Sequence, residues 1–392
     1  MYIFKGILKK DNIMNKILLT LLCITGFSFY SFSQSNTYNH YFGNIHAHSG
    51  YSDGNKDKST SDCADPGCSF ELAKKAAHYD FMGISEHNHS QAGMKDKKNW
   101  YKGIDMAKKV TTSNFVAMYG MEWGTISNGG HVIIYGYDKL IGWEKGLYDV
   151  YNPKTSYDTL FKLIADKKGA IAYLAHPEKT NYNALFTNGY NETNDKAIIG
   201  IAVRTGPALG KNAHRTDYAA KPSGSYYARY KDLLKNGYHL APGIDHDSHY
   251  SNFGLVTQRR LVILAKRLTQ DALLEAIRAR RFYASDDFNC NVSFSVNDAV
   301  MGSIITSEKE PVIAVTIEDK DDEEIKYIRL YYGHSGSGIN PKYVKLPIQK
   351  NSNSYTHSFT NYEKNKEYYY YLEIKQKDGD KIVTAPVWVT NK

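Results

Sequence analysis

Two histidines and a carboxylate lie within eight residues near the start of the chain, in the segment His46-Ala-His48-Ser-Gly-Tyr-Ser-Asp53. Neutral imidazole is the commonest metal ligand in proteins. Histidines two residues apart do not share a helix face, whereas at the end of a strand both can turn toward one ion. The run 41–45 before them predicts a short strand. The segment alone indicates a metal site or, as the other interpretation, hydrogen-bonded histidines at a strand edge.

Further candidate ligands adjoin other predicted strands. Apolar runs predict strands at 81–85, 115–119, 131–135, 170–174, 198–203, 239–244 and 261–265, and amphipathic patterns predict helices at 70–79, 157–167, 227–235 and 270–280. The candidates at or just beyond strand ends are Glu86, His87, Glu122, His176, Asp245, Asp247 and His249, and His131 begins a strand. This alternation predicts a largely parallel α/β domain, and the number of units favours a TIM-like barrel over an open sheet. Because barrel active sites form at the carboxyl ends of strands, we expect these side chains to lie close together.

The spacing of apolar residues along the sequence changes near residue 288. Alternating apolar and polar residues predict seven short strands, at 292–296, 311–318, 325–333, 343–348, 354–360, 367–375 and 381–389. The pair Asp378-Gly379 resembles a hairpin turn. This pattern predicts an immunoglobulin-like β-sandwich. We therefore expect a leader at 1–34, a barrel at 39–287 and a sandwich at 288–392.

The N-terminus has the layout of a secretory signal peptide. Lys16 precedes an apolar run, and small polar residues follow up to Ser33 and Gln34. The run is short for a membrane span, and Met14 is a more natural start than Met1, which makes the first residues an upstream extension. A lipid anchor at Cys23 is disfavoured because no small residue precedes that cysteine. We expect export to the periplasm or the extracellular space, with no membrane span left after cleavage.

Charge and cysteine content limit the partners. The chain has 392 residues and a formal net charge of +8, and without residues 1–34 it keeps 45 basic and 40 acidic side chains. This small, dispersed excess does not indicate nucleic acid. Cys63 and Cys68 flank a turn-rich segment, where either a local disulfide or two separate thiols fit; a zinc site lacks a second cysteine pair. In the disulfide interpretation, Cys290 is a buried free thiol.

Five ordered motifs resemble the PHP family, named for polymerase and histidinol phosphatase. They are His46-x-His48 with Asp53, Ser85-Glu86-His87-Asn88, Glu122 with His131 downstream, His176-Pro177, and Asp247-Ser-His249. Members of this family are metal-dependent phosphoesterases on a distorted seven-unit (β/α) barrel, and the resemblance covers residues 39–285. The segment 273–284 also resembles the exported branch of the family that carries a sandwich domain.

The resemblance implies a site for three metal ions. His46, His48, Glu122 and Asp247 would hold the first ion, and Glu122 would bridge to a second held by His131 and His176. Asp53, His87 and His249 would hold the third. Glu86 stands where the family usually has an aspartate behind the ligands. Asp245 is a supporting residue or an alternative to Asp247.

The expected chemistry is hydrolysis. A bound divalent ion lowers the pKa of its water from 15.7 to about 7, which supplies hydroxide at neutral pH. Six imidazoles among nine ligands favour zinc, iron or manganese over magnesium or calcium, which prefer oxygen. Arg204, His214 and Arg215 are candidates to bind phosphate, with solvated surface charges as the other interpretation.

Three functions remain open at this point. The first is an exported phosphoesterase that hydrolyses phosphomonoesters or phosphodiesters of small molecules or glycans by attack of metal-bound hydroxide on phosphorus. The second uses the same site on a carboxyl ester or a carbamate. The third is a non-catalytic surface protein that binds glycans. The complete ligand set favours an enzyme.

Overall fold

The structure is a computed structural model that describes residues 38–76, 79–89, 93–94, 96–206, 208–209, 224–348, 354–360 and 362–392. The predicted leader, with Cys23, lies outside these residues, as do His214 and Arg215. Residues Tyr38–Lys392 form one compact unit.

The predicted strands and helices of the first part are present, with shifted boundaries. The strands are β1 (Asn39–Asn44), β2 (Phe81–His87), β3 (Val116–Thr125), β4 (Gly130–Tyr135), β5 (Ile141–Gly142), β6 (Val150–Tyr151), β7 (Ile171–Leu174), β8 (Ile198–Thr205), β9 (Ala241–Asp245), β10 (Arg260–Ala265) and β11 (Phe282–Ser285). The helices are α2 (Lys58–Ser61), α3 (Pro66–Lys75), α4 (Lys97–Val110), α5 (Tyr157–Asp166), α6 (Asn183–Thr187), α7 (Glu192–Ala197), α8 (Gly224–Lys235) and α9 (Gln270–Arg278), with a 3-10 turn at Ile126–Asn128. The helix predicted at 70–79 begins earlier because Asp65 caps it and Pro66 occupies its first position.

The sheet of this part is mixed, which corrects the largely parallel arrangement expected from the sequence. Its order is β10-β1-β2-β3-β4-β7-β8-β9, with parallel pairs at β1/β2, β2/β3, β7/β8 and β8/β9. The pairs β3/β4, β4/β7 and β1/β10 are antiparallel. Only residues 126–129 join β3 to β4, and a parallel connection needs about a dozen residues or more. At the far end of this order, β9 contacts β11.

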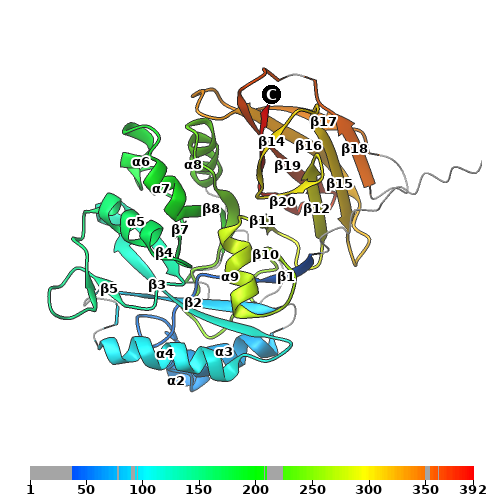
Figure 1. Ribbon diagram of the computed structural model, residues 1–392. Helices are drawn as coiled ribbons and strands as arrows, with labels where there is room; N and C mark the ends of the chain where they lie inside the picture. Colours follow the sequence, from blue (N-terminus) through cyan, green and yellow to red (C-terminus); the bar gives the residue numbers. More distant parts are fainter. Residues whose placement is uncertain are drawn as a thin grey trace, which may run out of the picture. The chain divides into compact units, whose positions relative to one another are not determined.

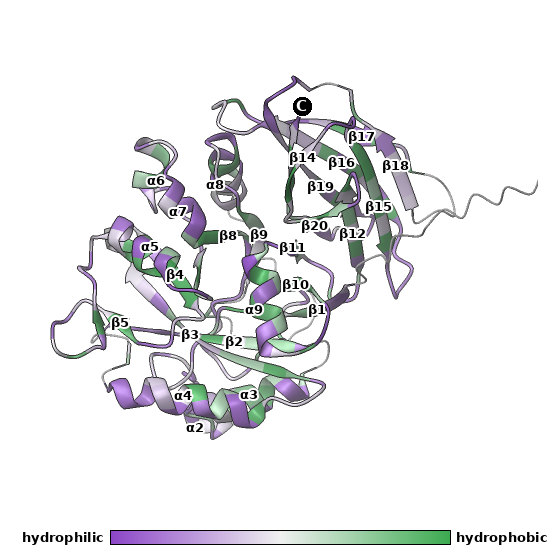
Figure 2. Cartoon of the chain, viewed as in Figure 1, coloured by the Kyte–Doolittle hydropathy of each residue, from purple (hydrophilic) through white to green (hydrophobic). Residues whose placement is uncertain are grey.

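Helices pack against the strands and against one another. Helices α3 and α4 lie side by side, with α4 against β3, α8 against β8 and α9 against β10 (Figure 1). In Figure 2, α3 and α4 alternate between polar and apolar colours, whereas β8 is mainly apolar. Gly103 allows α4 to lie close to the sheet, because a Cβ atom there would come within 2.2 Å of the Tyr119 ring. The burial of every residue in β2 explains its continuous apolar run.

The second part is built from antiparallel strands, with one parallel pair at its edge. Its strands are β12 (Asn291–Val296), β13 (Ala299–Val300), β14 (Ile304–Ser307), β15 (Val312–Glu318), β16 (Ile325–His334), β17 (Lys342–Leu346), β18 (Ser354–Ser358), β19 (Glu367–Gln376), β20 (Lys381–Val383) and β21 (Val387–Asn391). One sheet has the order β13-β12-β15-β18. The order β14-β21-β19-β20 continues through β11 into the first sheet, and β16 pairs with β19 and β17.

Two sequence features explain details of this second part. The strand predicted at 381–389 is divided into β20 and β21, and Pro386, which has no backbone N–H for a ladder, lies between them. The hairpin predicted at Asp378-Gly379 is present between β19 and β20, and Gly379 has a φ of +125°. Buried and more exposed residues alternate along β12 and β15, as the period of two predicted.

The three described cysteines form one disulfide and leave one free thiol. Cys63 and Cys68 form a disulfide, which resolves the two alternatives left by the sequence. Cys290 is a buried free thiol, as expected in the disulfide interpretation.

His239 links the two parts of the chain. Its Nδ1 lies 2.8 Å from Asp195 Oδ2 of α7, and its Nε2 lies 3.0 Å from Glu367 Oε1 of β19. Burial lowers the pKa of His239, but the two carboxylates outweigh burial and raise that pKa to about 9. The protonated imidazole therefore stabilises the contact between α7 and β19.

We expect His239→Gln to remove a pH-dependent part of the stability. Because the folded pKa exceeds the unfolded value of 6.5, the stabilisation is fully present below pH 6.5 and is lost as the pH rises through about 9. The unfolding free energy of the variant should be lower than that of the wild type at both pH values. This deficit should be about 2–4 kcal/mol larger at pH 6 than at pH 10. Urea denaturation at both pH values measures this difference, and His357→Gln is the control. Equal losses at the two pH values would contradict the prediction.

Candidate metal centre

The first two histidines lie in a turn that Asn44 holds at the end of β1. Asn44 Oδ1 accepts a hydrogen bond from the His46 N–H at 3.1 Å, and its Nδ2 donates to the His46 carbonyl at 2.7 Å. The His48 N–H donates to the Ser248 carbonyl at 2.9 Å. The first and last motifs of the sequence are thereby joined through the backbone.

Glu122 lies at the centre of the histidine cluster. It belongs to β3, and its side chain is fully buried. Its Oε1 lies 3.1 Å from His46 Nε2, 2.9 Å from His131 Nδ1 and 3.1 Å from His176 Nε2, and its Oε2 lies 3.2 Å from His48 Nε2 and 3.1 Å from His87 Nδ1. Five imidazoles from four segments therefore face one carboxylate.

Two aspartates and a sixth histidine complete the cluster. Asp247 Oδ1 lies 3.2 Å from His46 Nε2 and 3.1 Å from His48 Nε2. Asp53 Oδ2 lies 3.4 Å from His249 Nε2, and its Oδ1 lies 3.7 Å from His87 Nε2. The structure therefore brings together all nine residues that the sequence predicted as ligands.

Two of these residues have strained backbone angles. The φ of Asp247 is +50° and that of His176 is +24°, a region that non-glycine residues rarely adopt. Such strain persists where surrounding contacts impose it, and it is common at functional sites. Here the two strained residues are those whose side chains reach other members of the cluster: Asp247 lies beside His46 and His48, and His176 lies beside Glu122.

The donor atoms fit divalent cations. Ligands about 2.1 Å from an ion lie about 3.0 Å apart in an octahedron and about 3.4 Å apart in a tetrahedron. The distances around Glu122 are 2.9–3.2 Å. Among the described residues, four buried atoms of the cluster lack a hydrogen-bond partner: His46 Nε2, His87 Nδ1, Glu122 Oε2 and Asp53 Oδ1. These buried groups can therefore hold metal ions.

The charges of the cluster lead to the same conclusion. Both ring nitrogens of His46 face carboxylates, although a neutral imidazole has only one N–H. Burial lowers the pKa of His46, but Asp245, Glu122 and Asp247 outweigh burial and raise it well above its usual value. Burial raises the pKa of Glu122, and the neighbouring imidazoles lower it well below its usual range. The buried carboxylates thus require positive charge, which protons or metal ions can supply.

Asp245 and Asp247 contact opposite sides of His46. Asp245 Oδ1 accepts from His46 Nδ1, and its Oδ2 accepts from the His176 N–H. Asp247 lies at Nε2, beside Glu122. This arrangement suits Asp247 as a ligand and Asp245 as the group that orients His46, because a metal-binding histidine usually donates its other N–H to a carboxylate.

We expect Asp245→Asn to weaken metal binding about 10–100-fold without unfolding the protein. Asparagine keeps the size of the side chain but orients His46 less strongly. Competition with a metal indicator measures the affinity, and the exposed Asp105→Asn is the control. An unchanged affinity would contradict the role of Asp245.

Glu86 supports the loop that follows His48. Its carboxylate accepts from the Ser49 N–H at 3.1 Å and from the hydroxyls of Ser49 and Ser52. Glu86 is fully buried, and burial raises its pKa. It therefore lies behind the ligands, where the sequence placed it.

Of the three predicted phosphate contacts, the structure describes Arg204 alone. Arg204 Nε lies 2.6 Å from Asp286 Oδ1, in an ion pair. His214 and Arg215 lie outside the described residues. The sequence reasoning also missed Asn44, although its position two residues before His46 was a usable signal.

One side of the cluster is open. The side chains of Asp247 and Asp53 are 24% and 29% exposed, whereas those of Glu122, His46 and His48 are fully buried. Near this side, the ring of His89 lies 5.3 Å from that of His87 and stacks at 5.3 Å on Trp143. No sequence signal distinguished Trp143.

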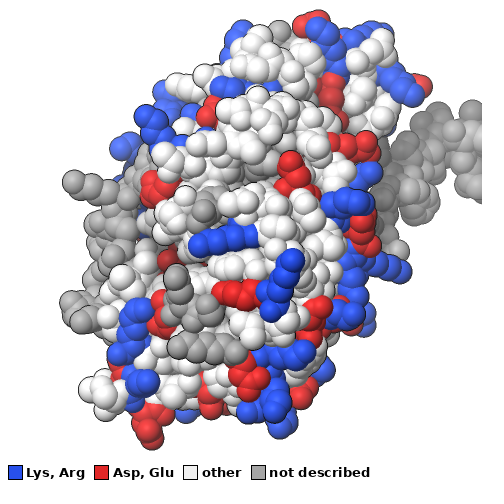
Figure 3. All heavy atoms as spheres, turned by 90° about the vertical axis from the view of Figure 1, so that its left-hand side faces the viewer, with Lys and Arg blue, Asp and Glu red and all other residues white. Residues whose placement is uncertain are grey.

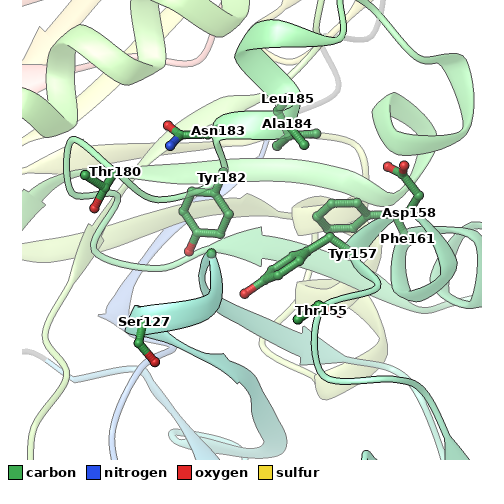
Figure 4. Close-up of a pocket in the computed structure, with 11 residues that line it drawn as sticks. Ser127, Thr155, Tyr157, Asp158, Phe161, Thr180, Tyr182, Asn183, Ala184 and Leu185 are labelled. Carbon is green, nitrogen blue, oxygen red and sulfur yellow. The ribbon is translucent and has the colours of Figure 1, made fainter.

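A cavity of about 390 Å³ lies beyond Tyr182 (Figure 4). Aromatic rings of Tyr157, Phe161 and Tyr182 line it, with Ser127 and Thr155 on another side. The Tyr182 hydroxyl lies within hydrogen-bond distance of the carbonyl oxygens of His131 and Ala175, which share its one hydrogen. Tyr182 therefore connects the cavity wall to the segments that carry His131 and His176.

Charged groups are mixed on the face shown in Figure 3. Acidic and basic side chains alternate there, without a continuous field of one sign on the described surface. Within the described ranges, no helix combines the length and apolar character needed to cross a membrane.

These features define a mixed α/β protein with buried histidines and carboxylates that can hold metal ions. No family model matches the chain. An uncharacterised protein of Chlamydia muridarum (strain MoPn / Nigg) is 24% identical over an alignment of 196 positions that covers 43% of this chain. The matched region spans 29% of that relative.

Two solved structures show distant likeness. The novel lesion-specific endonuclease PfuEndoQ from Pyrococcus furiosus is 12% identical, with a TM-score of 0.35 over 61% of this chain and 56% of that one. A structure titled "Myokine structure" is 13% identical, with a TM-score of 0.19 over 25% of this chain and 93% of that one. These likenesses are too distant to assign a family.

Proposed function

We propose that the chain is an exported, metal-dependent phosphoesterase of the PHP type that hydrolyses phosphomonoesters or phosphodiesters. The observation that carries this proposal is the convergence of five imidazoles on the buried carboxylate of Glu122. Isolated histidines at strand edges would have no reason to share one acceptor in the core. The substrates of the proposed enzyme would be phosphoesters of small molecules or glycans.

Three groups of side chains would hold three ions. The first group is His46, His48, Glu122 and Asp247; the second is Glu122, His131 and His176; the third is Asp53, His87 and His249. The position of His87 supports the third group, because its Nδ1 faces Glu122 and its Nε2 faces Asp53. Six imidazoles favour zinc, manganese or iron. Such ions supply hydroxide at neutral pH and stabilise charge on phosphoryl oxygens.

The residues of the chain prepare the site for this chemistry. Asp245 accepts a hydrogen bond from the N–H at His46 Nδ1, so that the lone pair of Nε2 is free to bind an ion. Glu86 holds the loop between His48 and Asp53. The buried ligands exclude water on one side, and the exposed edges of Asp53 and Asp247 leave room for a substrate on the other.

The fold of the proposed enzyme is a distorted (β/α)7 barrel at 39–287 followed by an immunoglobulin-like sandwich at 288–392. The contact of β9 with β11 supports a sheet that curves back on itself. The alternating burial of β12 and β15 supports a sandwich. Export rests on the leader pattern of the sequence.

Substrate turnover tests the proposal. The chain without its leader, reconstituted with manganese, zinc or iron, should hydrolyse aryl phosphate monoesters or diesters faster than aryl acetates. Asp247→Asn, which removes a proposed ligand charge, should be inactive on both substrate types. Strong acetate turnover without phosphatase activity would replace the proposal with the carboxyl-ester hydrolase. A metal-loaded protein inactive on every substrate would favour the glycan-binding alternative.

A further inference from the structure

Three loops of the second part bring acidic side chains together far from the histidines in sequence. The loops are 286–290 between β11 and β12, 319–324 between β15 and β16, and 377–380 between β19 and β20. Donor atoms of Asp287, Cys290 and Asp319 lie within 4.8 Å of one another. We refer to Asp287, Asp319, Asp321 and Glu323 as the acidic cluster.

The side-chain amide of Gln376 lies in the middle of the acidic cluster. Its Nε2 is 2.9 Å from Asp287 Oδ2, 2.6 Å from Asp319 Oδ2 and 3.0 Å from Glu323 Oε2. An amide nitrogen has two hydrogens, so it cannot donate fully to three carboxylates. The two N–H groups of one amide are therefore too few for the three carboxylate oxygens around it.

Two buried carbonyl oxygens beside the acidic cluster have no partner. Gln376 is fully buried and Asn289 is 4% exposed, yet Gln376 Oε1 and Asn289 Oδ1 accept no hydrogen bond from any described residue. Asn289 Nδ2 donates to Asp321 Oδ2 at 2.7 Å, so this side chain also points to the cluster. Unpartnered oxygens next to carboxylates are unfavourable unless a cation binds them.

Among the residues that the structure describes, no basic side chain neutralises the acidic cluster. Within the described ranges, no lysine or arginine forms an ion pair with any of its four carboxylates; the nearby Lys377 pairs with Glu324. Burial and the neighbouring acids raise the pKa of Glu323 to about 7. The cluster thus gathers negative charge that protein cations leave uncompensated.

We propose that these loops bind a calcium ion through carboxylate oxygens of Asp287, Asp319 and Glu323 and the carbonyl oxygen of Gln376. A half-turn of the Gln376 amide exchanges its nitrogen and oxygen, so that Oε1 joins the three carboxylates. Calcium takes six to eight oxygen ligands at about 2.3–2.6 Å, so neighbouring ligand oxygens around it lie about 3 Å apart. The three carboxylate oxygens lie 2.6–3.0 Å from the Gln376 amide position that Oε1 would occupy, close to that ligand-to-ligand spacing. Asn289 and Asp321 offer further oxygens from the same loops.

The ligand chemistry favours calcium over the metals of the histidine cluster. The groups are oxygens, which suit hard cations, and no imidazole is among them. Burial raises the pKa of the Cys290 thiol, so Cys290 stays protonated and is a poor ligand. The ion would connect β11 and β12 with the β15–β16 loop and β19.

Calcium titration of the chain without its leader tests this proposal. Isothermal titration with calcium chloride should show one ion per chain, and about 1 mM calcium should raise the Tm by about 2–4 °C. Asp319→Asn should weaken binding at least about tenfold. The same variant should raise the Tm without calcium, because it removes repulsion among the carboxylates. The exposed Asp322→Asn, in the same loop, should bind as the wild type does.

Several results would overturn the proposal. A wild type that binds no calcium would do so, as would unchanged binding in both Asp319→Asn and Asp287→Asn. Loss of calcium binding in a folded Glu122→Gln variant would assign the ion to the histidine cluster instead. Circular dichroism of each variant establishes folding, and Glu323→Gln replaces any variant that fails to fold.

Discussion

Glu122→Gln is expected to remove bound metal and to lower phosphoester hydrolysis at least about 10³-fold. Five imidazoles face the Glu122 carboxylate, and the neutral amide neither bridges two ions nor balances their charge. The amide has the size of the carboxylate, so the packing of β3 against β2 and β4 should persist. Steady-state kinetics and elemental analysis of the same preparation measure both effects.

The exposed Glu308→Gln is the matched control for this prediction, because it removes the same charge far from the histidines in sequence. It should retain wild-type activity and metal content. A Glu122→Gln variant that keeps both metal and activity would show that this carboxylate holds no ion. A Tm close to that of the wild-type protein stripped of metal would show that the variant is folded.

The metal affinity is expected to rise steeply with pH. Burial lowers the pKa of His48, but Asp247 and Glu122 outweigh it and raise that pKa to about 10 in the metal-free protein. Burial also lowers the pKa of His176, and carboxylates led by Glu122 raise it to about 9. Metal ions bind neutral imidazole, so binding must displace both protons at any pH below 9. The raised pKa of His46 adds a third proton to be displaced, so the affinity should rise at least about 100-fold per pH unit between pH 6 and pH 8.

Competition with a metal indicator across this pH range measures the slope. Protons compete with the ion at low pH, so the affinity must fall as the pH falls. In Asp247→Asn the slope should decrease, because a carboxylate that raises the pKa of His48 is gone. A flat profile in the wild type would show that these histidines are not ligands.

The sequence predicted that these residues lie close together because one rule governed the positions of most of them. Glu86 and His87 lie at the end of β2, and Asp245 lies at the end of β9. The candidate ligands and their supporting residues therefore lie at the ends of strands. Polar residues at the ends of apolar runs are visible without a structure. The structure adds which nitrogen faces which oxygen, as at His87, which lies between Glu122 and Asp53.

The roles of Asp245 and Asp247 required the structure. Side chains alternate along a strand, so residues two apart would face the same way if β9 continued. The strand ends at Asp245, and the left-handed φ of Asp247 redirects its side chain. One aspartate therefore contacts Nδ1 of His46 and the other contacts Nε2. No sequence pattern encodes this change of direction.

The sheet topology was only partly predictable for a similar reason. The apolar runs that form β3 and β4 were found, but their antiparallel pairing depends on the short turn at 126–129. Helix α4 was not predicted, because Gly103 interrupts its apolar face. Only the position of Tyr119 explains that glycine. The acidic cluster was likewise hidden, since its residues come from two loops that are separate in the sequence.

The metal content of the purified protein tests most directly whether the histidines and carboxylates around Glu122 form a metal centre. Inductively coupled plasma mass spectrometry of residues 35–392 should find two to three equivalents of zinc, manganese or iron. His46→Ala and Asp247→Ala should lower that content and abolish hydrolysis while the protein remains folded. An active wild type without metal, or unchanged metal and activity in both variants, would contradict the assignment of this cluster as the active site.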